Sequence, residues 1–513
     1  MSSGARRIPL PILDGTDAPG RDVRSDPPRA PIDPTTPRVA LVTLGCDKNT
    51  VDSERLLGRL LGAGVALAPR TADADVVLVN TCGFIDVAKE ESIDAILGAA
   101  RLKAEGRVRA VVALGCLVQR YKRELGEELP EVDLFLGLTE IDRLLPELRA
   151  RGLLPPLDAV PNMERPLRAL ASTTSHSSFL KISEGCDHTC AFCAIPLMRG
   201  RFRSTPIDAL VAEARELEAR GVVELNIVSQ DTTWYGRDWR RDGIVDDGQY
   251  FIGRPFARMA GPAAKPPPTS GPASALRSTA LPRLLTELLA ATTIPWLRLF
   301  YMYPSGVTRE LVALMAREPR LVPYLDLPIQ HGSDAVLKRM RRPERSATIR
   351  ERVAWLRDAV PDLTLRSTVI VGFPGEGEED FEALLELLEE LRFDRLGAFA
   401  YSREDGTQAA AMADQVPDAV KRERLERLQD LQRSISLERN ERRVGTDVDL
   451  LVDHVAAGRR GDVAIGRTAA QAPEIDGVVR VRGAHAARPG TFLRARLTAA
   501  DEDDLVAVAM GGG

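Results

Sequence analysis

The stretch GCDHTCAFC, residues 185–193, places three cysteines in a C-x3-C-x2-C spacing, namely Cys186, Cys190 and Cys193. Thiolates this close in sequence can wrap one face of a cubic iron–sulfur cluster, and such a cluster normally takes four thiolates. Three thiolates leave one iron open, and an open coordination position is typical of a catalytic rather than a structural metal site. The stretch therefore predicts a catalytic four-iron cluster.

Two other uses of these cysteines stand beside the cluster. A disulfide framework suits a small secreted protein, whereas this chain has 513 residues and only six cysteines. A zinc site with His188 as the fourth ligand is the stronger alternative. However, His188 lies inside the loop, where reaching the same ion would strain the backbone. No second C-x2-C pair exists in the chain, so the cluster is favoured and zinc stays open.

The composition is that of a globular protein with several domains. Hydrophobic residues make up 44%, charged residues 28%, and the net charge is −5. All six cysteines precede residue 194 and lie in motifs, which favours metal binding in a reducing compartment. No apolar run is long enough to cross a bilayer, and the N-terminus lacks an apolar signal core. We therefore expect a cytoplasmic protein with no membrane partner.

The N-terminal part of the chain changes character near residue 38. Residues 1–37 are rich in Pro, Arg and Asp, and they predict a disordered tail, with a partner-binding arm as the alternative. Residues 38–150 alternate helical patterns with short apolar runs at 39–45, 76–81, 110–115 and 134–138. Alternation of strand and helix predicts an α/β domain with an open parallel sheet.

Three of these strands end in a cysteine: Cys46, Cys82 and Cys116. In open α/β sheets the ligand site lies beyond the carboxyl ends of the strands, so the three thiols should converge. Each cysteine precedes a helix, whose N-terminal dipole would stabilise a thiolate. A lone buried cysteine is usually a small hydrophobe, but three in the same position predict a second cluster with one open iron. We expect residues 38–150 to form an N-terminal cluster-binding domain.

The central part, residues 172–415, holds six strand candidates separated by helical patterns, at 178–183, 224–229, 296–302, 324–329, 365–373 and 395–401. Six βα units are too few for a closed eight-unit barrel and predict a partial (βα)6 barrel. The cluster loop, residues 330–333 and residues 372–376 all follow strand ends and should share one rim. Residues 237–280 carry the stretch PAAKPPPTSGPASA and are interpreted as a flexible insertion.

The C-terminal part begins with a charged helical pattern at 417–442. Short apolar–polar alternations follow and predict a small closed β-barrel over residues 440–512. Arginine and acidic residues are nearly balanced there, whereas an RNA-binding barrel should be clearly basic. The acidic run Asp501–Asp504 could steer a basic protein substrate, or it could be a solvated turn.

Six motifs together resemble the methylthiotransferase family of radical S-adenosylmethionine (SAM) enzymes over residues 38–512. They are LGCDKNTVDSE, NTCGFI, GCDHTCAFCAIPLMRGRFRS, DTTWYG, YLDLPIQHGS and STVIVGFPGE. The family joins an N-terminal cluster domain, a radical SAM barrel and a C-terminal TRAM barrel. The stretches GCDKNTVDSE and NTCGFID are similar to its RimO-type branch, which methylthiolates an aspartate of small-subunit ribosomal protein twelve.

The resemblance implies two 4Fe-4S clusters and SAM as cofactors. Cys186, Cys190 and Cys193 would hold the cluster that cleaves SAM to a 5′-deoxyadenosyl radical, and the radical would remove hydrogen from the β-carbon of the target aspartate. The N-terminal triad would hold the auxiliary cluster that carries the sulfur. Phe192 matches the family's aromatic residue before the third cysteine. An electron donor is implied, and the resemblance leaves room for a sulfur-supplying partner.

Three further residues are candidates for contacts with SAM. Gly372 would let the backbone approach the adenosyl group. Gln230 and Gln330 lie just beyond strands and could bind ribose or carboxylate, although an ordinary loop contact accounts for either equally well.

Other functions remain to be weighed against this one. A transfer-RNA methylthiotransferase would have the same architecture. A two-cluster electron carrier would need eight cysteine ligands, and this chain has six cysteines. A zinc-stabilised binding module would contain no iron.

Overall fold

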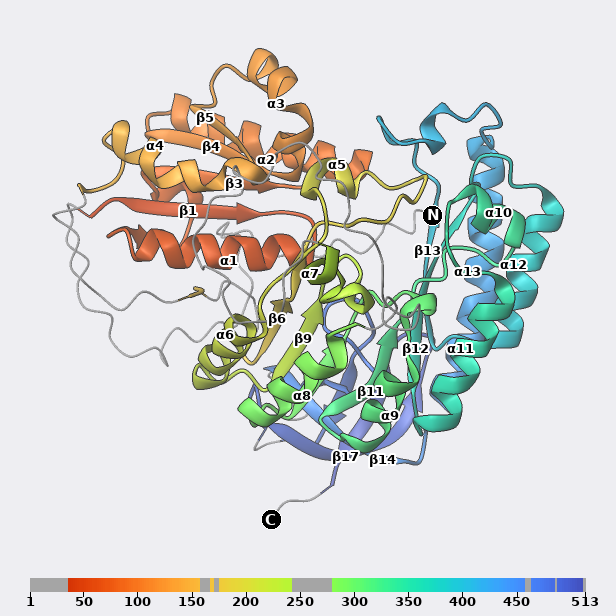
Figure 1. The fold of residues 1–513 in the computed structure, drawn as a ribbon. Coiled ribbons are helices and arrows are strands. Elements are labelled where there is room, and N and C mark those ends of the chain that lie inside the picture. The colour runs from red at the N-terminus through yellow and green to blue at the C-terminus, as the bar shows by residue number, and fades with distance from the viewer. Residues whose placement is uncertain are drawn as a thin grey trace. The chain divides into compact units, whose positions relative to one another are not determined.

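The computed structural model describes residues 36–156, 167–169, 175–241, 279–456, 463–484 and 487–510. The chain forms two compact units (Figure 1). Of the described residues, the first unit comprises 36–156, 167–169 and 197–200, and the second comprises the others. Nearly all of the expected tail 1–37 and insertion 237–280 lies outside the described residues.

The first unit is built on a parallel sheet with the strand order β2-β1-β3-β4-β5. Its strands are β1 (Arg38–Thr43), β2 (Ala66–Leu67), β3 (Val76–Thr81), β4 (Ala110–Gly115) and β5 (Leu134–Gly137). Its helices are α1 (Asp47–Leu61), α2 (Asp86–Ala104), α3 (Cys116–Glu128) and α4 (Leu144–Ala150), preceded by a 3-10 turn at Leu138–Arg143. The predicted open parallel sheet is confirmed, and only the two-residue strand β2 was not expected.

Burial explains why the sequences of two central strands, β3 and β4, are almost wholly apolar. Every residue of β3 and β4 is buried. One apolar core lies between the sheet and α2 and α3, and a second lies between the sheet and α1 and α4. A parallel sheet covered by helices on both faces needs continuous rather than alternating hydrophobic runs.

The second unit contains six parallel strands in the order β13-β12-β11-β10-β9-β6. They are β6 (Ser177–Lys181), β9 (Glu224–Val228), β10 (Trp296–Leu299), β11 (Leu321–Asp326), β12 (Thr364–Val371) and β13 (Arg395–Ala400). The intervening helices include α6 (Ile207–Ala219), α8 (Leu281–Ala291), α9 (Arg309–Arg317), α10 (Asp334–Arg339), α11 (Ser346–Ala359) and α12 (Glu378–Leu391). Neighbours in the sheet are neighbours in the chain, as the predicted partial barrel requires.

The loops that were expected to share a rim do so. The cysteine loop follows β6 and the short strand β7 (Ser183–Glu184), which pairs with β8 (Arg203–Ser204), and it precedes α5 (Ile195–Arg199). Residues 330–333 follow β11 and residues 372–376 follow β12. Because all six strands run parallel, these loops lie at the same end of the sheet.

The chain then passes through helix α13 (Asp418–Glu441) into a closed five-stranded barrel. The barrel strands are β14 (Asp447–Ala456), β15 (Val463–Thr468), β16 (Val479–Arg482), β17 (Phe492–Ala500) and β18 (Leu505–Ala509). Strand β16 shows the expected alternation, with Val479 and Val481 buried and Arg480 and Arg482 exposed. Strand β15 was missed, because its residues VAIGRT lack a clear alternation of apolar and polar side chains.

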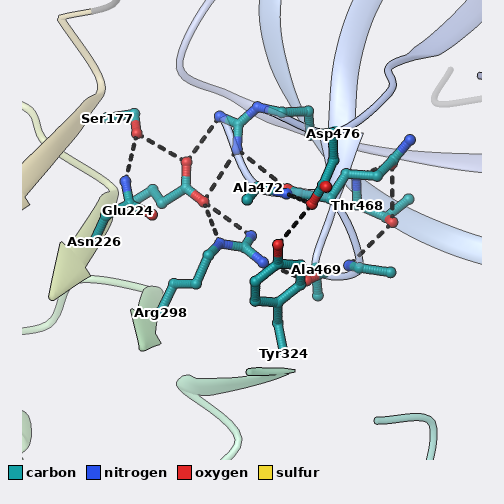
Figure 2. A network of polar contacts seen from close by, with 12 residues as sticks. Ser177, Glu224, Asn226, Arg298, Tyr324, Thr468, Ala469, Ala472 and Asp476 are labelled. Atoms are coloured by element: carbon teal, nitrogen blue, oxygen red, sulfur yellow. Dashed lines mark hydrogen bonds and ion pairs between the residues drawn. The ribbon is translucent and has the colours of Figure 1, made fainter. Parts of the chain in front are cut away.

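A buried ion network joins the barrel to the parallel sheet within the second unit (Figure 2). Glu224, the first residue of β9, is fully buried and accepts a hydrogen bond from Ser177 at 2.9 Å. Its carboxylate lies 2.9 Å from Nη2 of Arg298 on β10 and 2.8 Å from Nη2 of Arg467 on barrel strand β15. Burial pushes the pKa of Glu224 upward, but the two guanidiniums outweigh it, and the pKa lies below its ordinary value.

The network extends over the same end of the sheet. Arg467 also binds Asp453 of β14 at 2.8 Å, and Asp453 lies 3.0 Å from Nε2 of His176. The Tyr324 hydroxyl donates to Asp476 at 2.8 Å (Figure 2). Glu224 and Ser177 begin their strands, so the barrel is anchored at the end of the sheet opposite the cysteine loop.

We predict that Glu224→Gln lowers the free energy of unfolding by about 3–5 kcal/mol at pH 7, because it leaves two buried guanidiniums without their shared carboxylate. The folded-state pKa of Glu224 is depressed, so the carboxylate's contribution is fully present above the unfolded value of about 4.3. That contribution is lost as pH falls through the lower folded value. The parent protein and the variant should therefore differ most at pH 7 and less at about pH 3.

Guanidinium unfolding followed by circular dichroism checks this expectation. The exposed Glu389→Gln on α12 is the matched control and should change stability by less than about 0.5 kcal/mol. An effect of Glu224→Gln that is small, or equal at both pH values, would contradict the account of this network.

Candidate functional site

The first unit brings its three cysteines to one edge of the sheet. Cys46 immediately precedes α1, Cys82 follows the last residue of β3, and Cys116 follows β4 and begins α3. Cys46 and Cys116 lie directly at the start of their helices, whereas three residues separate Cys82 from α2, which begins at Asp86. The sulfur of Cys82 instead accepts the backbone N–H of Phe84.

Close contacts tie the three strand ends together. Gly45, beside Cys46, has φ +94°, and a Cβ there would lie 2.7 Å from Cβ and 2.8 Å from Sγ of Cys82. Asn49 donates to the carbonyls of Leu44 at 2.8 Å and of Thr81 at 3.2 Å. The Cys116 thiol donates to the Asn49 side-chain oxygen at 3.8 Å. Asn49 thus links the ends of β1, β3 and β4.

Burial dominates the electrostatics of this triad. It raises the pKa of Cys82 to about 11 and of Cys116 to about 12. Burial therefore acts against the expected stabilisation of thiolates by helix N-termini. Arg199, in the segment 197–200 of the first unit, acts in the opposite direction to burial at both thiols.

The guanidinium of Arg199 is held in place beside the triad. It donates to the Asn49 side-chain oxygen at 2.6 Å and to Asp52 at 3.0 Å. Its exposed fraction is only 4%. A buried cation of this kind offsets the negative charge that three metal-bound thiolates would bring to the site.

In the second unit, Cys186, Cys190 and Cys193 share one loop. The Cys193 N–H donates to the Cys190 carbonyl at 3.1 Å, and the Ile195 N–H donates to the Cys193 sulfur at 3.5 Å. The backbone N–H of His188 donates to the Cys186 sulfur. Burial raises the pKa of Cys193 to about 12 and also raises the pKa of Cys186.

The position of His188 weighs against the zinc alternative. Its Nε2 lies 2.7 Å from Oδ2 of the buried Asp231. Its ring stacks on Tyr303 with centroids 4.1 Å apart and meets the edge of Trp234 at 4.8 Å. The imidazole thus contacts Asp231, Tyr303 and Trp234 rather than the cysteines. The loop is left with three thiols as metal ligands.

Each triad offers three cysteine thiols, which are the ligands that iron–sulfur clusters use. Within the described ranges, no group of three or more His, Cys, Asp or Glu is arranged to hold one metal ion. A cubic cluster binds each thiolate to a different iron, so its ligands stand farther apart than the ligands of one ion. Backbone N–H donors to the sulfurs of Cys82, Cys186 and Cys193 are also typical of cluster sites.

The residues expected to contact SAM differ in their burial and in what they contact. Phe192 packs against an apolar cluster that includes Met340, Phe373 and Tyr401. Gln330 has φ +70°, and its backbone bonds Thr368 and Ile370 of β12. Gln230 is half-buried just after β9.

The space beside Gly372 was expected to admit the adenosyl group, but Lys421 occupies it. Its φ is +72°, and a Cβ there would lie 2.3 Å from Cγ of Lys421 on α13. The missing side chain therefore makes room for Lys421, and that packing is a reason for glycine independent of any ligand. Contacts of all four residues with SAM remain predictions.

Sequence reasoning missed three residues beside the cysteine loop. Asp231 opens the motif DTTWYG, which was noted without a role. Tyr303 and Arg342 follow β10 and α10 and carry no recognisable spacing. Only the expectation of a shared rim could have drawn attention to them.

We predict that Gly45→Ala binds less iron than the parent protein, by up to about four atoms per chain. The added Cβ would collide with Cys82, and φ +94° is strained for alanine. Gly98→Ala, on α2 where a Cβ meets nothing within 4 Å, is the control and should keep full iron. Iron analysis after anaerobic reconstitution tests this, and full iron in Gly45→Ala would show that the close approach is not needed.

Three family models match the chain in the order of its parts. "Uncharacterized protein family UPF0004" matches residues 38–137, "Radical SAM superfamily" matches 180–388, and "TRAM domain" matches 444–510. The radical SAM match makes SAM and an iron–sulfur cluster the cofactors of the middle segment. No helix in the described part of the chain is long and apolar enough to cross a membrane.

Curated relatives are similar over nearly the whole length. Proteins named ribosomal protein uS12 methylthiotransferase RimO share 46% identity in Desulforudis audaxviator, covering 91% of this chain and 96% of that protein. The Anaeromyxobacter sp. (strain Fw109-5) relative shares 47% identity, covering 92% and 93%. The Geobacter sulfurreducens relative shares 41% identity, covering 91% and 98%. The chain therefore belongs to the RimO family of ribosomal protein uS12 methylthiotransferases.

Proposed function

We propose that this chain transfers a methylthio group to the β-carbon of an aspartate in ribosomal protein uS12. The observation that carries the proposal is the pair of cysteine triads, one where three parallel strands of the first unit end and the other in the single loop that follows β6 and β7 in the second unit. Identity above 40% to uS12 methylthiotransferases over nine-tenths of the chain supports the substrate.

The two triads would have different roles. We assign a 4Fe-4S cluster to Cys186, Cys190 and Cys193 and a second one to Cys46, Cys82 and Cys116. When bound, the first supplies the electron that cleaves SAM to a 5′-deoxyadenosyl radical, and the second supplies the sulfur. Radical chemistry suits this substrate, because the aspartate β-carbon is too weakly acidic for a side-chain base near neutral pH.

The chain's own residues bind and shield these groups. The cysteines of both triads are held at buried or half-buried positions, which keeps water from reactive species. Phe192, Gln230, Gln330 and Gly372 stay candidates for binding SAM on the rim of the second unit. An electron donor, a sulfur-supplying partner and a cytoplasmic location belong to the same proposal.

The C-terminal barrel supports a protein rather than an RNA substrate. Its exposed arginines on β16 and β17 are largely paired: Arg480 with Asp504 at 2.5 Å, Arg494 with Asp449 at 3.0 Å, and Arg496 with Asp447 at 3.5 Å. Paired guanidiniums leave little free positive charge to follow a phosphate backbone.

The acidic run of the barrel is a structured turn. The Asp501 carboxylate accepts the N–H groups of Asp503 at 2.9 Å and Asp504 at 2.6 Å. Asp504 binds the Val478 N–H at 2.8 Å as well as Arg480. Of the two alternatives that the sequence left open, this geometry supports the turn over substrate steering.

We predict a separation of functions between the triads. Cys190→Ala should form no 5′-deoxyadenosine from SAM under anaerobic reducing conditions, because the reducing cluster loses a ligand. Cys82→Ala should still cleave SAM but should lose methylthiolation of uS12. Chromatography of the nucleoside and mass spectrometry of the protein give the two readouts, and normal methylthiolation by Cys82→Ala would remove the role of the N-terminal triad.

The substrate is tested directly in cells with and without this protein. Mass spectrometry of ribosomal proteins should find methylthio-aspartate in uS12 only when the protein is present. Transfer RNA should carry the same modifications in both samples. A methylthio group missing from transfer RNA, with uS12 unchanged, would contradict the substrate assignment and favour the transfer-RNA alternative.

A further inference from the structure

Two side chains lie beside Cys190 and have no role in the chemistry proposed above. The Tyr303 hydroxyl lies 3.4 Å from the Cys190 sulfur. The side chain of Arg342, only 3% exposed, is close enough to the same sulfur for the two groups to interact electrostatically. Neither residue lies in the loop, since Tyr303 follows β10 and Arg342 follows α10.

Stacking fixes the direction of the Tyr303 hydroxyl. The His188 ring lies 4.1 Å from the Tyr303 ring and only 7° from parallel. The Arg342 guanidinium lies over the Tyr303 ring at 3.8 Å from its centre. One face of a ring cannot hold both groups at contact distance, so the tyrosine is sandwiched between the histidine and the arginine. The Asp231 carboxylate lies 2.7 Å from Nε2 of His188 and holds the imidazole against the Tyr303 ring.

Arg342 is held just as firmly. Its Nη2 donates to the Pro328 carbonyl at 3.0 Å, and its Nε lies 3.2 Å from the Glu344 carboxylate. Glu344 is fully buried and accepts the Ser305 hydroxyl at 2.8 Å. A guanidinium is not deprotonated near neutral pH, and the buried Glu344 carboxylate beside it offsets the cost of burying its charge. The guanidinium therefore stays charged beside Cys190.

We propose that Tyr303 and Arg342 are positioning residues that raise the reduction potential of the cluster held by Cys186, Cys190 and Cys193. The inference rests on the proposed function of that triad. Hydrogen bonds to the sulfurs, local charge and exposure set the potential of an iron–sulfur cluster. A hydroxyl and a cation at one sulfur stabilise the reduced cluster more than the oxidised one, because reduction adds negative charge.

The step is an uptake of one electron from a one-electron donor, and no bond in the protein forms or breaks. The hydroxyl proton stays on Tyr303, and the guanidinium protons stay on Arg342. What these residues change is the equilibrium between the oxidised and reduced cluster, and hence how much of the enzyme can cleave SAM with a given reductant.

Tyr303→Phe tests the hydroxyl while keeping the ring that His188 and Arg342 sandwich. We expect the reduction equilibrium to move about tenfold toward the oxidised cluster, about 59 mV for one electron. An anaerobic potentiometric titration followed by electron paramagnetic resonance measures this shift. The slower SAM cleavage should recover with a stronger reductant, which a merely structural defect would not allow.

Tyr324→Phe is the matched control, because it also deletes a single buried tyrosine hydroxyl but at the opposite end of the sheet. Its potential should equal that of the parent. Arg342→Lys keeps the charge and should shift the potential less than Arg342→Met. Iron content shows whether each variant still carries its clusters, and Tyr303→Phe decides the question if the arginine variants do not fold.

The outcomes separate this inference from the function on which it rests. An unchanged potential in a fully loaded Tyr303→Phe protein would overturn the tuning role alone. A Cys190→Ala protein that keeps all its iron and still cleaves SAM would overturn the proposed function of the triad.

Discussion

A buried thiolate is costly unless its charge is offset, and both cysteine triads must satisfy this constraint. Burial is the largest of the causes that raise the pKa of Cys82, Cys116, Cys186 and Cys193. Such thiols must lose their protons when they bind metal, so the surroundings have to favour the thiolate in the loaded protein. In both sites backbone N–H groups point to sulfur and an arginine lies nearby. The arginine is Arg199 in the first unit and Arg342 in the second.

The second unit keeps chemistry and anchoring at opposite ends of one sheet. The cysteine loop and its neighbours follow the carboxyl ends of the strands, whereas Glu224 and Ser177 begin their strands. Arg467 crosses from the C-terminal barrel to Glu224 and is nearly fully buried. The contacts that hold the barrel are therefore separate from the loops of the rim.

The sequence predicted the parts of this design that depend on local pattern. The cysteine spacings, the apolar strands of the first unit and the six βα units of the second all follow from short stretches of chain. The pairing of Glu224 with Arg467 joins residues 243 positions apart and leaves no local signal. Tyr303 and Arg342 could not be predicted from the sequence for the same reason. The burial that raises the pKa values of Cys82 and Cys116 could not be predicted from the sequence either, because it depends on the packing of distant segments.

The central claim is that the two triads are independent cluster sites. Iron analysis and electron paramagnetic resonance of two triple variants, reconstituted without oxygen, test it most directly. The parent should hold about eight irons per chain, and alanine at Cys46, Cys82 and Cys116, or at Cys186, Cys190 and Cys193, should leave about four. Each variant should retain one reducible signal different from that of the other. A full complement in either variant, or the loss of all iron in both, would contradict the claim.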